Sequence, residues 1–105
     1  MSILSFLGLD NKSGSIAEYQ QKGALVLDVR TPSEYAGGHI KGSKNIPLNE
    51  LPTRIQEVKK LNKPVIACCQ SGMRSSQATQ FLQKNGIDVV NGGGWRNVEM
   101  NLKQI

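Results

Sequence analysis

Residues 65–75 read Val65-Ile66-Ala67-Cys68-Cys69-Gln70-Ser71-Gly72-Met73-Arg74-Ser75, an apolar run followed by a short glycine-containing loop that ends in an arginine. The apolar run is typical of a buried strand, and residues 75–85 favour a helix. A loop that turns from a strand into a helix directs several backbone N–H groups inward, and the helix N-terminus adds about half a positive charge at the same point. The stretch therefore predicts an anion-binding loop around a thiol.

Cys69 is the candidate nucleophile of this loop. A thiol held there is expected to ionise below the ordinary cysteine pKa of about 8.5, because N–H donors and the nearby Arg74 guanidinium stabilise the thiolate and not the thiol. We therefore predict catalytic roles for Cys69 and Arg74, with Arg74 holding an oxyanion. The substrate-binding loop is predicted to consist of Gln70, Ser71, Gly72, Met73 and Ser75.

The second cysteine and the single histidine receive structural interpretations. Neighbouring side chains of a strand point to opposite faces, so Cys68 is expected to face away from the loop as a structural residue, with a resolving thiol as the alternative. His39 is expected to brace its loop as a hydrogen-bond donor, because a pre-ionised thiolate needs no base. The two adjacent cysteines and one histidine do not have the spacing of a zinc site, so we expect no metal and no cofactor.

The composition predicts one folded domain. The chain has 105 residues, 38% hydrophobic and 20% charged, which favours neither a disordered nor a membrane protein. No apolar run approaches the roughly 20 residues of a membrane-spanning helix. We expect a domain over 13–105 after a short N-terminal extension over 1–12, which lacks the basic region and cleavage signal of a secretory leader. Together with two unpaired cysteines, this predicts a cytoplasmic protein in a reducing compartment.

The formal net charge of +5 does not predict a nucleic-acid partner. The 13 lysines and arginines are scattered, with only Lys59 and Lys60 adjacent, and aromatic residues make up 5%, too few for base stacking. The mildly positive field instead favours small anions as ligands.

Helical and strand patterns alternate along the chain. The segment Thr31-Pro32-Ser33-Glu34 combines an N-cap threonine, a proline at the first helical position and a capping-box glutamate. We expect helices over 13–22, from 31 onward, from 49 or 51 to 61, over 75–85 and over 95–103, strands over 24–29, 45–47, 65–68 and 87–90, and a loop over 92–94. The helix that ends at 61 is expected to bury one face, made of Leu51, Ile55, Val58 and Leu61. This order predicts an α/β fold with a mostly parallel central sheet and helices on both faces.

Ligands bind such sheets outside the carboxyl ends of the strands. Three features fall there: Asp28-Val29-Arg30, the Cys69 loop, and Gly92-Gly93-Gly94-Trp95. Asp28 and Arg30 are expected to be either a strand-end cap and a surface cation or supports of the Cys69 loop. Trp95 is expected to pack in the core, with the three glycines letting the chain approach the loop closely.

Taken together, these residues resemble the rhodanese domain family of sulfurtransferases. Three separated signatures match in the family's order and at about its spacing. They are Leu27-Asp28-Val29-Arg30 with Glu34-Tyr35 and Gly38-His39-Ile40-Lys41-Gly42-Ser43, then Asn45-Ile46-Pro47, then Cys69-Gln70-Ser71-Gly72-Met73-Arg74-Ser75 with Gly93-Gly94-Trp95. The match covers nearly the whole chain and implies a single rhodanese-like domain.

The resemblance implies sulfur transfer through a persulfide on Cys69. A donor such as thiosulfate, a polysulfide or a low-molecular-weight persulfide gives its outer sulfur to the thiolate, and an acceptor such as cyanide or a thiol removes it. Many family members carry a basic residue directly after the cysteine, where this chain has the neutral Gln70. This departure predicts poor use of dianionic thiosulfate, and the apolar Met73 favours a persulfide on a less charged carrier.

Two other functions stay open. A thiolate phosphatase or arsenate reductase also combines a cysteine, an N–H loop and an arginine, but it places five residues between the two, whereas only four separate Cys69 from Arg74. The shorter loop makes a narrower cup, suited to a single sulfur atom. A sulfur carrier or binding module that delivers persulfide to a partner protein also fits, because both Cys69 and Arg74 are retained.

Overall fold

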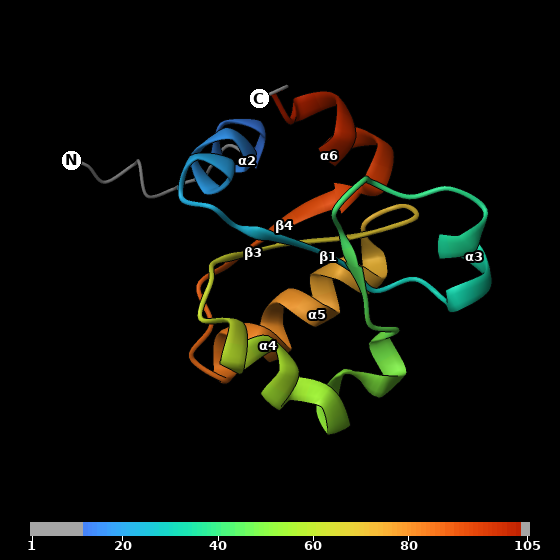
Figure 1. The fold of residues 1–105 in the computed structure, drawn as a ribbon, viewed down its shortest axis with the longest axis vertical. Helices are drawn as coiled ribbons and strands as arrows, with labels where there is room; N and C mark the ends of the chain where they lie inside the picture. Colours follow the sequence, from blue (N-terminus) through green and yellow to red (C-terminus); the bar gives the residue numbers. More distant parts are fainter. Residues whose placement is uncertain (1–11, 104–105) are drawn as a thin grey trace.

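Four parallel strands form the centre of the fold in the computed structural model, which describes residues 12–103 (Figure 1). In chain order the elements are α2 (Lys12–Gln21), β1 (Leu25–Asp28), α3 (Pro32–Ala36), β2 (Lys44–Asn45), the 3-10 helix η1 (Leu48–Arg54), α4 (Ile55–Leu61), β3 (Val65–Cys69), α5 (Met73–Lys84), β4 (Val89–Gly94) and α6 (Trp95–Asn101). The expected N-terminal extension over 1–12 lies outside the described residues except for residue 12. Between residues 12 and 103, no helix has the length and apolar character to cross a membrane.

The strands lie in the order β2-β1-β3-β4, and each neighbouring pair is parallel. Helices α2 and α6 lie on one side of the sheet, and α4 and α5 lie on the other (Figure 1). This confirms the predicted α/β fold with a parallel sheet covered on both faces. Because the strands are parallel, their carboxyl ends lie at one edge of the sheet, where Asp28 and Cys69 are the last residues of neighbouring strands.

The central strand β3 is buried along its whole length. Val65, Ala67 and Cys69 belong to the core cluster that faces α4 and α5. Ile66 and Cys68 belong to the cluster that faces α2 and α6. The alternation confirms that the two cysteines point to opposite sides of the sheet, as the period of a strand requires.

Helix α3 begins with the predicted capping box. The backbone N–H of Glu34 donates to Thr31 Oγ1 over 3.2 Å, and the backbone N–H of Thr31 donates to Glu34 Oε1 over 3.0 Å. Pro32 occupies the first helical position, where its missing N–H costs no hydrogen bond. The cap fixes the start of this five-residue helix next to the carboxyl edge of the sheet.

The strand predicted over 87–90 is present as β4, but its bounds are Val89–Gly94. The predicted glycine loop over 92–94 is therefore wrong. The register pairs Ala67 with Asn91 and Cys68 with Gly93, which leaves Gly92 as an extra residue in a bulge. A Cβ on Gly92 would lie 2.5 Å from Val98 Cγ2 and 2.9 Å from Ile66 Cγ2. The glycine run therefore lets α6 pack closely on the sheet instead of ending the strand.

The helix predicted from 49 or 51 to 61 consists of two elements. Pro52 lies inside η1 and lacks the N–H that an α-helical ladder needs, so the α-helical part begins only at Ile55. Leu51 and Val58 are buried as predicted. Leu61 is 41% exposed, and the expectation that it is buried is wrong, because it is the last residue of α4.

The close packing at the bulge makes a prediction for Gly92→Ala. The added methyl group has no room between Val98 and Ile66, so we expect the free energy of unfolding to fall by about 1–3 kcal/mol. Gly37→Ala is the matched control, because its Cβ would meet only ordinary contacts at 3.5 and 3.7 Å and its φ is −77°. Denaturant unfolding should show a change within about 0.5 kcal/mol for the control. Equal losses in both variants would contradict the packing argument.

Candidate active site

Cys69 lies at the carboxyl edge of the sheet, and its side chain is buried. Its Sγ accepts hydrogen bonds from the backbone N–H groups of Gly72, at 3.0 Å, and of Ser75, at 3.3 Å. The Oγ of Ser75 lies 3.5 Å from the same sulfur. Three polar groups therefore converge on one buried sulfur atom.

Two opposing effects set the pKa of Cys69. Burial raises this pKa, because removal from water penalises the charged thiolate. Hydrogen bonds from the Ser75 hydroxyl and from the N–H groups of Ser75, Gly72 and Ser71 favour the thiolate and outweigh burial. The pKa of Cys69 is therefore lowered below its ordinary value, which is the condition for a reactive thiol at neutral pH.

The loop after Cys69 is shorter than the sequence predicts, because α5 begins at Met73 and not at residue 75. Gly72 precedes the helix with a φ of +105°, a conformation that L side chains rarely adopt. The first turn of α5 is thereby brought against the sulfur, and its N–H groups have no partners within the helix. Gln70 and Ser71 are exposed in the loop, and Met73 is 71% exposed.

The glycines of β4 let the Cys69 loop lie close to the sheet. A Cβ on Gly94 would be 2.9 Å from the carbonyl oxygen of Gln70, a distance that only a shift of the backbone would relieve. A Cβ on Gly72 would be 3.5 Å from Gly93 Cα. These contacts confirm the predicted close approach of the glycine segment to the loop.

Cys68 has a different environment from its neighbour. It is fully buried in the cluster that contains Ile66, Trp95 and Val98. Burial raises the pKa of its thiol strongly, and the nearby Asp28 carboxylate raises it further. Cys68 is thus held as a neutral thiol on the face of the sheet away from the loop.

Arg74 is bound to a partner that the sequence analysis does not assign to it. Its guanidinium donates to both carboxylate oxygens of Glu34, at 2.7 and 3.0 Å, and the two side chains are each 33% exposed. The guanidinium, together with the N–H and hydroxyl of Thr31, lowers the pKa of Glu34 to about 2. Most of the positive charge that Arg74 brings to the loop is therefore balanced by a carboxylate from α3.

Asp28 and Arg30 form a buried ion pair, with 1% and 2% of their surfaces exposed. Arg30 Nη2 donates to Asp28 Oδ2 over 2.7 Å and to the Gly38 carbonyl over 2.8 Å, and Nη1 donates to the Glu34 carbonyl over 3.3 Å. The alternative of a surface cation at Arg30 is therefore wrong. Within residues 12–103 neither side chain bonds directly to the Cys69 loop, and their link to it runs through Glu34 and Arg74.

His39 and Trp95 have structural positions. The Nδ1–H of His39 donates to the Tyr35 carbonyl over 2.8 Å, and the two rings stack with centroids 3.8 Å apart. This matches the expected bracing role, with the ring exposed. Trp95 is 8% exposed in the core, and the guanidinium of Arg30 lies 4.8 Å from its ring centroid. The prediction of core packing for Trp95 is confirmed.

Sequence reasoning misses two residues of the site, Glu34 and Asn91. The sequence places Glu34 in the capping box and in the family signature but not next to Arg74, because this pairing joins positions 40 residues apart. Asn91 Oδ1 accepts the Ser75 hydroxyl at 2.7 Å and the Gly93 N–H at 3.0 Å. A polar residue directly before three glycines marks the position of Asn91 in the sequence, but it does not indicate a contact with Ser75.

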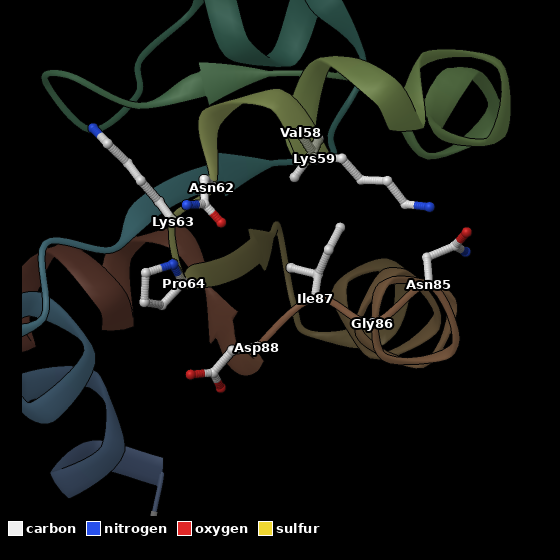
Figure 2. A pocket seen from close by; sticks show the side chains of 9 residues that line it. All are labelled: Val58, Lys59, Asn62, Lys63, Pro64, Asn85, Gly86, Ile87 and Asp88. Atoms are coloured by element: carbon white, nitrogen blue, oxygen red, sulfur yellow. The ribbon is translucent and has the colours of Figure 1, made fainter.

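A cavity of about 480 Å³ lies at the opposite edge of the sheet (Figure 2). Helix α4, its connection to β3 and the connection from α5 to β4 line it, and Pro64, Gly86 and Asp88 are among its residues. The Asp88 carboxylate is already paired with Lys22 at 3.3 Å and accepts the Tyr19 hydroxyl. None of the predicted site residues lines this cavity.

Comparison with known proteins decides the family. The rhodanese-like domain family matches residues 14–100. The chain belongs to this family. The uncharacterized protein YqhL of Bacillus subtilis is 49% identical over 63 residues, which cover 60% of this rhodanese-like domain and 49% of YqhL, so the chain spans about half of that relative.

Two further relatives agree. The thiosulfate sulfurtransferase PspE of Escherichia coli is 38% identical over 76 residues, covering 70% of this rhodanese-like domain and 73% of PspE. The crystal structure of reduced Bacillus anthracis CoADR-RHD superposes with a TM-score of 0.70 at 37% identity, over 85% of this domain and 16% of that chain. Both the resemblance inferred from the motifs and the fold are thereby confirmed.

The ion pair between Glu34 and Arg74 predicts a specific dependence of stability on acid. The pKa of Glu34 is about 2 in the folded protein and about 4.3 in an unfolded chain, so the folded state binds fewer protons between these values. The contribution is complete above the unfolded pKa and is lost as pH falls through the folded pKa. Glu34→Gln should therefore lose less stability than the unsubstituted protein between about pH 5 and about pH 2.

Thermal unfolding across this range measures the difference. Glu99→Gln is the control, because Glu99 is an exposed carboxylate on α6 without an ion pair in the described part of the chain. The thermal stability of Glu99→Gln should depend on pH in the same way as that of the unsubstituted protein. Parallel pH profiles for Glu34→Gln and the unsubstituted protein would mean that the pair adds no pH-dependent stability.

Proposed function

We propose that this protein is a sulfurtransferase that moves a sulfane sulfur from thiosulfate, a polysulfide or a low-molecular-weight persulfide to a thiol or cyanide through a Cys69 persulfide. The observation that carries the proposal is the buried Sγ of Cys69 with N–H donors from Gly72 and Ser75 at 3.0 and 3.3 Å. Such donors stabilise a thiolate nucleophile before the substrate arrives. Membership of the rhodanese-like family supports the same chemistry.

The transfer takes place in two displacement steps. The Cys69 thiolate attacks the outer sulfur of the donor, so that a Cys69 S–S bond forms while the bond from that sulfur to the rest of the donor breaks. With thiosulfate, sulfite leaves with the bonding electron pair, and the negative charge of the enzyme moves to the outer sulfur. Cyanide or a thiolate then attacks this outer sulfur, and the Cys69 thiolate leaves. The charges balance in both steps without a metal or an external oxidant.

The charge of the loop supports a donor of low charge. Gln70 brings no cation, and the Arg74 guanidinium is paired with Glu34 through two hydrogen bonds. The loop then attracts anions mainly through its N–H groups and the N-terminus of the 12-residue α5. We therefore rank a polysulfide or a low-molecular-weight persulfide above the dianion thiosulfate as a donor.

A protein acceptor is the second candidate for the outgoing sulfur. Met73 is 71% exposed on the loop that carries the sulfur, and an exposed flexible thioether suits contact with an apolar partner surface. The domain would then act as a sulfur carrier that delivers persulfide to a partner. The phosphatase alternative gains no such support, because the arginine that would hold the phosphate is bound to Glu34. Persulfide chemistry of this kind suits the reducing cytoplasm, where we place the protein.

The proposal is tested by the intact mass of the protein after incubation with thiosulfate and, separately, with glutathione persulfide. We expect a gain of one sulfur that maps to Cys69 and disappears on addition of cyanide. Cys69→Ser should gain none, because it lacks the nucleophile. Cys68→Ser is the matched control and should retain most of the gain, since Cys68 is fully buried on the other face.

Two results would count against this assignment. A folded protein with a free Cys69 that gains no sulfur from either donor would overturn the persulfide mechanism. Equal losses in the two serine variants would overturn the separate roles of the two cysteines.

A further inference from the structure

The side chains of Cys69, Ser75 and Asn91 form a row that crosses from β3 through α5 to β4. Ser75 Oγ lies 3.5 Å from Cys69 Sγ and 2.7 Å from Asn91 Oδ1. Ser75 is completely buried, so it has no exposed surface through which water could replace either partner. The regular register that precedes the bulge sets this geometry, because it places Asn91 opposite Ala67, on the face of the sheet that carries Cys69.

The hydrogen positions in this row follow from what each group can donate. A backbone N–H only donates, and the Gly93 N–H binds the side chain of Asn91 at 3.0 Å, so the atom that faces Ser75 is the amide oxygen. That oxygen accepts, which makes the Ser75 hydroxyl the donor in the 2.7 Å contact. The single hydroxyl proton of Ser75 is then unavailable to Cys69, and Ser75 Oγ can only accept the S–H of the thiol.

Ionisation of Cys69 reverses the direction of the hydrogen bond that the sulfur needs from Ser75. A thiolate accepts and no longer donates, so the Ser75 hydroxyl stabilises it only by turning its proton from Asn91 toward Sγ. Asn91 Oδ1 keeps the Gly93 N–H and loses its second donor. The Gly72 and Gly93 carbonyls are more distant acceptors, at 3.2 and 3.5 Å from Ser75 Oγ. The hydroxyl proton of Ser75 therefore has two main acceptors, Asn91 Oδ1 and the thiolate, and the one that it binds depends on the charge of the sulfur.

We propose that Asn91 is a positioning residue that holds the Ser75 hydroxyl proton while Cys69 is a thiol and releases it to Sγ when the thiolate forms. The ionisation part of this inference stands on the geometry alone. Its extension to turnover rests on the proposed function. In the persulfide the charge lies on the outer sulfur, so the Ser75 hydroxyl donates to Asn91 again. The hydroxyl turns back to Sγ as the Cys69 thiolate leaves. Asn91 thus tunes both the attack and the departure of the thiolate.

Other charged and titratable groups near Cys69 come from four elements. They are the neutral thiol of Cys68 on β3, the buried pair Asp28–Arg30 at the end of β1, and Arg74 on α5 with its partner Glu34 on α3. None of them bonds to Asn91 among residues 12–103. Substitutions at Asn91 leave these groups in place, so a change in Cys69 ionisation can be assigned to the Ser75 proton.

A double-mutant cycle tests the inference, with the pH dependence of Cys69 alkylation by iodoacetamide as the readout. Asn91→Leu removes the competing acceptor at nearly constant size, and the next carbonyl, that of Gly72, is farther from Ser75 Oγ at 3.2 Å. The thiol form loses its best hydroxyl bond, so the Cys69 pKa should fall by about one unit. Ser75→Ala should raise this pKa, because the thiolate loses a donor.

The decisive comparison is Asn91→Leu in the Ser75→Ala background. Without the hydroxyl proton there is nothing for Asn91 to hold, so the substitution should move the Cys69 pKa by less than half of its effect in the unsubstituted background. Any dipole of Asn91 that acts directly on the sulfur appears equally in both backgrounds and cancels in the cycle. Equal shifts in the two backgrounds would overturn the proposal.

A second variant covers the case in which Asn91→Leu does not fold, as monitored by circular dichroism. Asn91→Asp keeps the acceptor for Gly93 and strengthens the hold on the Ser75 proton. It should raise the Cys69 pKa, and by a smaller amount in the Ser75→Ala background, where only the added charge acts. An equal rise in both backgrounds would likewise overturn the proposal.

The outcome is separate from that of the sulfur-transfer test. Alkylation reports ionisation of Cys69 whether or not the protein accepts sulfur. A persulfide that forms normally, together with additive pKa shifts, would overturn the role of Asn91 and leave the proposed function intact. Non-additive shifts of the Cys69 pKa without any persulfide would support the role of Asn91 and overturn the proposed sulfurtransferase function.

Discussion

The buried Sγ of Cys69 accepts hydrogen bonds from the N–H groups of Gly72 and Ser75, and the reactivity of the site depends on this contact. Cys68, the neighbouring residue, shows the result of burial without such donors, since burial and the Asp28 carboxylate raise the pKa of its thiol. The two thiols have the same chemistry and similar burial, yet their pKa values move in opposite directions. The Cys69 sulfur has hydrogen-bond donors aimed at it, whereas Cys68 lies beside the Asp28 carboxylate.

The surrounding structure serves to keep those donors in place. The loop reaches the sulfur because Gly72 adopts a left-handed φ and because Gly94 leaves room for the carbonyl of Gln70. On the other side, the buried Arg30 holds the Glu34 carbonyl, and Glu34 holds Arg74 at the start of α5. The motif near the end of β1 therefore supports the loop through a chain of contacts, which rigidifies a donor arrangement that must be preorganised.

Local signals in the sequence predicted the parallel sheet, the capping box of α3 and the opposite faces of Cys68 and Cys69. These features follow from short-range periodicity and from residue types. The pairing of Arg74 with Glu34 and the contact of Ser75 with Asn91 join residues 40 and 16 positions apart, and no local pattern encodes them. The glycine run was misassigned as a loop because glycine marks turns in general, whereas here its missing side chain makes room for α6.

The loop donors overcome burial and lower the pKa of Cys69. The most direct measurement is the ultraviolet absorbance of the thiolate as a function of pH, with the signal of Cys69→Ser subtracted. Cys68 does not contribute in this range, because burial keeps it protonated. We predict a midpoint for Cys69 below the value of about 8.5 for a free thiol. A midpoint at or above that value would show that burial dominates and would contradict the account.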